Sequence, residues 1–214
     1  MREQELATPK DPQTSKPTII YKVGGSLLNQ STLTERLRGV LRLRPNASAL
    51  IVAGGGATAD IVRQWDRRHG LGEENSHWLA LSSVKLNESL LLRLLPEARL
   101  VTSRSDAGKV WDSGNLPIVC AHKFTRQEEP YSDIQLPHCW DVTSDSIAAW
   151  ITLVWPADEL VLLKSTSLTI GCNTDMSKTS RFVDSYFLNL ARQLPCVSWS
   201  NLRQAPLTIN HWLP

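Results

Sequence analysis

Short apolar runs alternate with glycine turns and helical repeats along the chain, beginning at residue 18. The run "TIIYKV" (18–23) is β-branched and aromatic, as a buried strand is, and the turn "GGS" follows it. Residues 31–43 then place apolar side chains at helical spacing, with Ser31 as the cap. The same order recurs in "ALIVA" (49–53), the turn "GGG" and a helix over 57–68. Two such units predict an α/β fold with a mainly parallel sheet.

Two of the predicted helices have apolar residues at regular spacing, and this spacing predicts the face that each helix buries. In the helix over 57–68 these residues share one face: Ile61, Val62 and Trp65. A longer helix over 73–95 has leucines at intervals of seven and four residues, ending at Pro96: Leu79, Leu86, Leu90 and Leu94.

The remaining elements follow the same alternation. Apolar runs predict further strands at 98–103, 116–121, 159–165, 196–200 and 206–209. Helical patterns cover 144–155 and 181–194. Residues 123–141 carry charges and prolines without a sustained period, so they are predicted to form a long loop, and such loops are often functional.

Composition restricts the class of protein. The chain has 214 residues, 42% hydrophobic and 21% charged, with a formal charge of +2, which favours one globular domain over 18–214. The polar, proline-containing residues 1–17 predict a disordered tail and no targeting segment. The small charge argues against a nucleic-acid partner, and the short apolar runs argue against a membrane span. Four cysteines without metal-type spacing favour reduced thiols in a cytoplasm.

The two glycine turns are candidate anion sites. Such turns, when they follow parallel strands, direct backbone N–H groups and a helix N-terminus at a ligand beyond the strand ends. Neither turn is a P-loop, because no "GK[ST]" follows at the required spacing. The stretch "GGGATA" (54–59) fits a dinucleotide-binding pattern, with Glu73 and Glu74 at the distance of a ribose-binding acid. A dinucleotide-binding domain therefore stays open as an alternative.

Lys22 stands at the end of the first apolar run, directly before the first glycine turn. A buried cation is costly unless an anion neutralises it. Either a salt bridge at the edge of the core or a bound phosphate would do so, and the adjacent Gly24 and Gly25 favour the phosphate.

Four motifs, in this order and spacing, resemble the amino acid kinase superfamily, which includes acetylglutamate, aspartate and uridylate kinases. They are "YKVGGSLL", "IVAGGGATAD", "WDVTSDSIAAW" and "LLKST". "SHWLA", "WDVTSDSIAAW" and "FVDSYF" are most similar to the short branch of 5-(aminomethyl)-3-furanmethanol phosphate kinase, and Asp184 belongs to the last of these motifs. The resemblance implies a three-layer α/β/α sandwich and a kinase that uses ATP and Mg²⁺.

The resemblance also implies roles for individual residues. Lys22 and Lys164 would flank the transferred phosphoryl group, and Asp145 would orient them, unless it merely caps its helix. The predicted phosphate- and nucleotide-binding residues are Gly24, Gly25, Ser26, Ser165 and Lys178. The predicted acceptor-binding residues are Gly54, Gly55, Gly56, His77, Thr143 and Ser144. No residue is predicted to bind a metal directly, and His122 and His138 lack a third ligand at zinc-site spacing.

The implied reaction is phosphoryl transfer from ATP to a phosphate, or else a carboxylate, of a small metabolite. The branch points to the aminomethylfuran phosphate of methanofuran-type cofactor synthesis. After Lys164 the stretch "STSLTIG" lacks the aspartate–glycine turn of many relatives, so a non-catalytic nucleotide- or metabolite-binding protein is the second hypothesis. The resemblance further implies a homodimer or a larger homo-oligomer.

Overall fold

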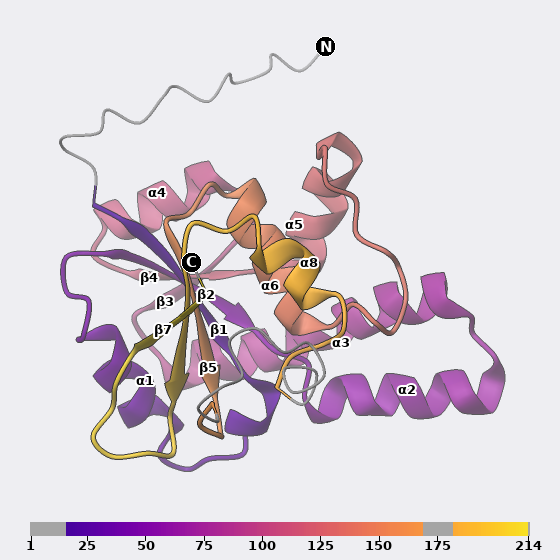
Figure 1. Ribbon diagram of the computed structural model, residues 1–214, viewed down its shortest axis with the longest axis horizontal. Coiled ribbons are helices and arrows are strands. Elements are labelled where there is room, and N and C mark those ends of the chain that lie inside the picture. The colour runs from indigo at the N-terminus through magenta and orange to yellow at the C-terminus, as the bar shows by residue number, and fades with distance from the viewer. Residues whose placement is uncertain (1–15, 169–181, 214) are drawn as a thin grey trace.

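A seven-stranded sheet forms the centre of the protein (Figure 1). In the computed structural model, which describes residues 16–168 and 182–213, its strand order is β3-β4-β2-β1-β5-β6-β7. The strands are β1 (Thr18–Val23), β2 (Ser48–Ala53), β3 (Ala98–Val101), β4 (Leu116–Val119), β5 (Glu159–Lys164), β6 (Val197–Asn201) and β7 (Asn210–Leu213). All neighbouring pairs are parallel except β6 and β7. The predicted α/β fold with a mainly parallel sheet is confirmed.

Helices cover both faces of this sheet and complete three layers (Figure 1). One core packs α1 (Leu33–Leu41) and part of α3 (Glu73–Leu94) against β1, β2 and β5. The opposite core packs α5 (Ala121–Glu128), α6 (Ser144–Val154) and α8 (Phe187–Ala191) against alternate residues of the same strands. The remaining elements are α2 (Ala57–His69), which packs on α3, α4 (Arg104–Asp112) and the short 3₁₀ helices η1 (Gly25–Leu27) and η2 (Glu129–Tyr131).

The alternation of side chains along β1 gives Lys22 its position. Tyr21 and Val23 point into the core that contains α1, whereas Ile20 points into the core that contains α6. Because side chains alternate along a strand, Lys22 lies on the same face as Ile20. Its ammonium group is therefore directed toward α6, near the carboxyl end of the central strand.

The predicted loop at 123–141 is wrong in its first part, where α5 and η2 lie. The helix α5 is amphipathic and buries Ala121, Phe124 and Thr125. The charged residues around these positions obscured the helical spacing in the sequence. The helix α4 was not predicted; the Ser103 hydroxyl caps it by accepting from the Asp106 N–H. The last strand was predicted at 206–209, but the structure has it at β7, Asn210–Leu213.

The helix faces were also assigned incorrectly. Of the predicted apolar face of α2, only Val62 is buried, and several of the regularly spaced residues are exposed: Ile61, Trp65, Leu79, Leu86 and Leu90. The helix α3 instead buries a face that includes the polar side chains of Asn87 and Glu88. Both side chains bond to backbone groups of other elements, and these bonds fix the orientation of the helix.

The chain was predicted to be helical over 181–194, but within the described residues α8 covers only Phe187–Ala191. The stretch before it turns so that the Asp184 carboxylate accepts from the Phe187 N–H. Residues 1–15, most of the predicted tail, lie outside the described part of the chain. No helix in the described part is both long and apolar enough to cross a membrane.

Candidate active site

Lys22, Asp145 and Lys164 meet at the carboxyl ends of the two central strands. The Lys22 ammonium lies 2.7 Å from Oδ1 of Asp145, and the Lys164 ammonium lies 2.7 Å from Oδ2. Lys22 comes from β1, Lys164 is the last residue of β5, and Asp145 lies in the first turn of α6. The structure thus brings together the three residues predicted to be catalytic. Asp145 does more than cap a helix, since each of its oxygens faces an ammonium group.

The three charges are buried and do not balance. Burial acts to raise the pKa of Asp145, but the charges of Lys22 and Lys164 and their hydrogen bonds outweigh it and hold that pKa at about 2. Burial also lowers the pKa of Lys164, more than the charge of Asp145 raises it. Within this group of three, one carboxylate between two ammonium groups leaves one positive charge in excess, while the Asp184 carboxylate, which also acts on Lys164, is bonded to donors at the start of α6. An anion bound beside the lysines would neutralise it.

Lys164 has two further partners. Its ammonium donates to the Phe182 carbonyl oxygen at 2.8 Å, and it lies 5.5 Å from the centre of the Trp199 ring. Both contacts suit a cation, because a carbonyl oxygen accepts and an aromatic face attracts positive charge. Only 14% of the Lys164 side chain is exposed.

The two glycine turns touch each other above these residues. A Cβ on Gly25 would lie 2.3 Å from the Cα of Gly56, so no larger side chain fits there. Gly56 has a φ of 52°, which favours glycine as well. Among the described residues, no acceptor faces the backbone N–H of Gly25, Gly55 or Gly56. These groups can therefore donate to a ligand, whereas Gly24 and Gly54 donate to the carbonyls of Leu163 and Val23.

Asn87 supports the second glycine turn from α3, and sequence reasoning missed it. Its side-chain amide donates to the carbonyl oxygens of Gly54 and Gly55, both at 2.7 Å, and to the Thr58 hydroxyl at 3.1 Å. A polar residue inside the leucine-rich pattern of α3 was the available signal. The glycine turn is thus held by a residue more than 30 positions away.

A cavity of about 160 Å³ opens beside the second glycine turn. Five of its lining residues were predicted to bind the acceptor: Gly55, Gly56, His77, Thr143 and Ser144. The sixth, Gly54, does not line the cavity. Much of the remaining wall is apolar, including Leu81, Val84, Trp140 and Ile147, and Asp60 and Arg63 add an ion pair with an N–O distance of 2.8 Å.

His77 is buried on the wall of this cavity, and its Nε2 has no hydrogen-bond partner among the described residues. Burial, and to a smaller extent the charge of a neighbouring histidine, His138, lower the pKa of His77 to about 4. Glu74 acts in the opposite direction. At neutral pH the imidazole is uncharged, so Nε2 is available for a hydrogen bond with a polar group of the acceptor.

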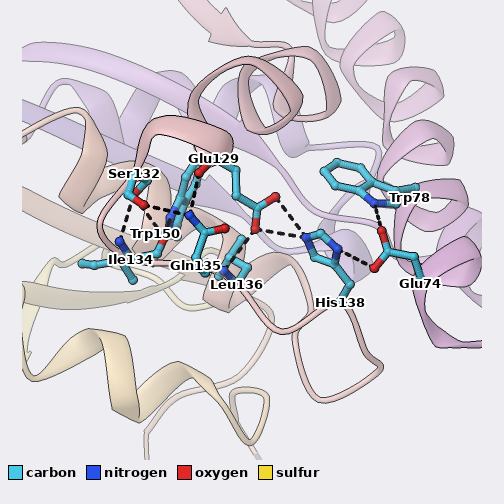
Figure 2. Close-up of polar contacts among 9 residues, drawn as sticks. All are labelled: Glu74, Trp78, Glu129, Ser132, Ile134, Gln135, Leu136, His138 and Trp150. Atoms are coloured by element: carbon cyan, nitrogen blue, oxygen red, sulfur yellow. Dashed lines mark hydrogen bonds and ion pairs between the residues drawn. The ribbon is translucent and has the colours of Figure 1, made fainter.

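A network around His138 fixes the neighbouring wall (Figure 2). Nδ1 of His138 lies 2.6 Å from a Glu74 oxygen, and Nε2 lies 3.0 Å from both Glu129 oxygens. The Trp78 indole donates to Glu74 at 2.7 Å. The His138 ring also stacks on that of His77, with centroids 4.6 Å apart. His138 thereby connects α3 to the segment that precedes the cavity residue Trp140. Glu74, one of the two glutamates that the dinucleotide hypothesis assigned to a ribose, is bonded to Trp78 and His138.

The predicted nucleotide side is described only in part. The hydroxyls of Ser26 and Ser165 lie 3.0 Å apart; Ser165 directly follows Lys164, and Ser26 lies four positions after Lys22. Lys178 lies outside the described residues. Within the described part, no group of histidine, cysteine and acidic side chains has an arrangement suited to a metal ion.

Comparisons with known proteins agree with this geometry. Residues 17–168 match the amino acid kinase family. No curated protein sequence matches the chain at a significant level. Among similar solved structures, UMP kinase from Ureaplasma parvum is 13% identical, with a TM-score of 0.63 and coverage of 90% of this chain and 93% of that one.

Two other solved structures are similar. Uridylate kinase from Archaeoglobus fulgidus is 14% identical, with a TM-score of 0.57 and coverage of 85% of this chain and 88% of that one. Aspartate kinase from Synechocystis is 13% identical, with a TM-score of 0.61, and the match covers 92% of this chain but 40% of that one. At these identities the likeness concerns the fold alone.

Proposed function

The chain belongs to the amino acid kinase family, and from that premise we propose that it transfers the γ-phosphoryl group of ATP to an ionised phosphate of a small metabolite. A carboxylate is the second candidate acceptor. The observation that carries the proposal is the group of Lys22, Asp145 and Lys164. Its excess positive charge lies at the carboxyl ends of the central strands, where open α/β sheets bind their ligands.

The chemistry needs positioned charge more than a proton acceptor. An acceptor oxygen forms a bond to the γ-phosphorus while the bond from that phosphorus to the β–γ bridging oxygen breaks, and the electron pair leaves with ADP. The two ammonium groups stabilise the negative charge on the transferred group and on the leaving oxygen. An acceptor phosphate is already ionised, so no general base is required.

The cavity beside Gly55 and Gly56 is the proposed acceptor site. The free N–H groups of these residues and the N-terminus of α2 would bind the acceptor's anionic group. The apolar wall and Trp140 favour a compact body with a flat, weakly polar surface. An aminomethylfuran phosphate has this form, and the motifs shared with that branch support it as the first acceptor to test.

Mg²⁺ would bind mainly through the phosphates of ATP. Each oxygen of Asp145 lies 2.7 Å from a lysine ammonium group, so this carboxylate does not fit as a metal ligand. When bound, Mg²⁺ would neutralise phosphate charge and keep several of its waters. Ser26 and Ser165, whose hydroxyls lie 3.0 Å apart, are the described residues with hydroxyl groups among those predicted to bind the nucleotide.

The test combines binding with transfer. Calorimetric titration with MgATP and with NADH identifies the nucleotide class, and an assay for ADP release uses UMP, L-aspartate, N-acetyl-L-glutamate and the aminomethylfuran phosphate as acceptors. We expect MgATP to bind and ADP release to require one of the acceptors. Binding of MgATP without transfer would favour the non-catalytic alternative, and binding of NADH alone would favour the dinucleotide alternative. Either result would contradict the proposal.

A further inference from the structure

Asp184 accepts hydrogen bonds from five donors at the start of two helices. Its Oδ2 accepts from the Thr143 N–H at 3.1 Å, the Thr143 hydroxyl at 2.7 Å and the Ser146 N–H at 3.0 Å. Its Oδ1 accepts from the Ser146 hydroxyl and from the Phe187 N–H at 3.0 Å. A carboxylate with this many donors is held firmly in one orientation.

These bonds replace the cap that α6 does not make for itself. The N-cap residue Thr143 forms no side-chain cap hydrogen bond within its own helix, and the first N–H groups of any helix need acceptors from elsewhere. Asp184 supplies the acceptor from a distant part of the chain. Its negative charge also suits the positive end of the helix dipole.

The capped turn is the one that carries Asp145. Asp145 lies between Thr143 and Ser146, the two residues that Asp184 holds. Two positions before Asp184, the Phe182 carbonyl accepts from the Lys164 ammonium at 2.8 Å. The segment 182–184 therefore contacts both the turn that positions Asp145 and the lysine on the other side of that carboxylate.

We propose that Asp184 is a positioning residue of the phosphoryl-transfer site, which holds the first turn of α6 so that Asp145 lies between Lys22 and Lys164. This inference rests on the proposed kinase activity. The role differs from ordinary helix capping, because it also places a negative charge near Lys164. Removal of that charge therefore affects the lysine as well as the helix.

Within the described part of the chain, several groups from different elements act on the Lys164 ammonium. Asp145 from α6 and Asp184 favour its charged form, whereas burial and Lys22 from β1 oppose it. The Phe182 carbonyl and the Trp199 ring of β6 also favour the cation. Loss of the Asp184 charge should therefore lower the pKa of Lys164.

The experiment compares Asp184→Asn with Ser146→Ala. D184N removes the negative charge and replaces one of the two acceptor oxygens with an NH₂ donor. S146A removes the single hydrogen bond from the Ser146 hydroxyl and leaves the charge of Asp184 in place. Lysine labelled at its ε-carbon reports the titration of Lys164 by NMR, and Lys164→Arg assigns its signal. Steady-state kinetics with MgATP gives kcat and KM for both variants.

We expect Lys164 to titrate at a lower pH in D184N than in the wild type. We also expect kcat of D184N to be about 10²-fold lower, which is the loss that a misplacement of about 1 Å causes. Its KM for ATP should change much less. S146A should keep the wild-type lysine titration. If D184N does not fold, Asp184→Glu keeps the charge but displaces the cap, and should retain the titration with a lower kcat.

The proposal is overturned if D184N, or D184E in its place, has the wild-type kcat, or if D184N and S146A shift the lysine titration equally. If the wild-type protein transfers no phosphoryl group, the proposed function fails separately. The lysine titration then still decides whether Asp184 acts on Lys164.

Discussion

At the scale of single residues, the resemblance to the amino acid kinases located the charged centre, because its motifs contain Lys22, Asp145 and Lys164, and of these only Lys22 was singled out by its position at a strand end. Lys22 and Lys164 end apolar runs, and Asp145 opens a helix with a serine-rich start. Asp184 and Asn87 could not be given roles in this way. The contacts of Asp184 with Thr143 and Ser146, and those of Asn87 with Gly54 and Gly55, span more than 30 positions of the chain, and no local spacing encodes them.

His77 should make stability depend on pH. Its pKa is about 4 in the folded protein and about 6.5 when exposed, so the unfolded chain binds more protons between these values. The free energy of unfolding should therefore fall as the pH falls through this window, by about 2 kcal/mol from pH 7 to pH 4.5. Urea unfolding at a series of pH values measures it.

The matched variants for this measurement are His77→Gln and His69→Gln. H77Q should remove most of the fall in that window, whereas H69Q replaces an exposed histidine at the end of α2 and should follow the wild-type curve. Below pH 4 the free energy of unfolding should fall further as the pH approaches the Asp145 pKa of about 2, and this fall should remain in both variants. Identical curves for H77Q and the wild type would refute the prediction.

At the scale of the elements, the hydrophobic pattern predicted the strands better than the helix faces. The central strands are buried on both faces, so any apolar run fits them. The orientation of α3 depends instead on Asn87 and Glu88, which bond to backbone groups in other elements. The spacing of the leucines predicted the wrong buried face, because the hydrogen bonds of Asn87 and Glu88 determine which face of α3 is buried.

Asn87→Leu should loosen the second glycine turn. Two buried carbonyl oxygens, those of Gly54 and Gly55, would lose their side-chain donor, which should lower the free energy of unfolding by about 1–3 kcal/mol. KM for the acceptor should rise more than KM for ATP, because this turn borders the acceptor cavity. Chemical denaturation and steady-state kinetics measure the two effects.

Asn75→Leu is the control in the same helix. The Asn75 side chain is exposed, and its amide donates to the Leu71 carbonyl at 2.9 Å and not to the glycine turn. N75L should leave both KM values near the wild-type values. An equal rise of KM for ATP and for the acceptor in N87L would show that Asn87 does not act through the acceptor side.

At the scale of the whole molecule, the exposed apolar side chains of α2 and α3 favour self-association. Trp65 is 47% exposed and Leu86 is 67% exposed, on helices that the predicted oligomer could cover. We expect a homodimer or a larger homo-oligomer by light scattering coupled to size exclusion. Leu86→Glu should lower the measured mass of the particle in solution, because a charge buried in the interface opposes association.

Leu100→Glu is the matched control, since Leu100 is 45% exposed but lies on β3 at the edge of the sheet. It should leave the mass unchanged. A monomeric wild-type protein, or equal masses for L86E and the wild type, would show that α2 and α3 do not form the interface.

The central claim is that the excess positive charge around Asp145 acts on the transferred phosphoryl group. Transfer of label from ATP labelled in its γ-phosphoryl group to the acceptor, compared between wild type, Lys22→Ala and the exposed-lysine variant Lys123→Ala, tests it most directly. We predict a loss of about 10³-fold in K22A and wild-type transfer in K123A. Transfer by folded K22A at the wild-type rate would contradict the account.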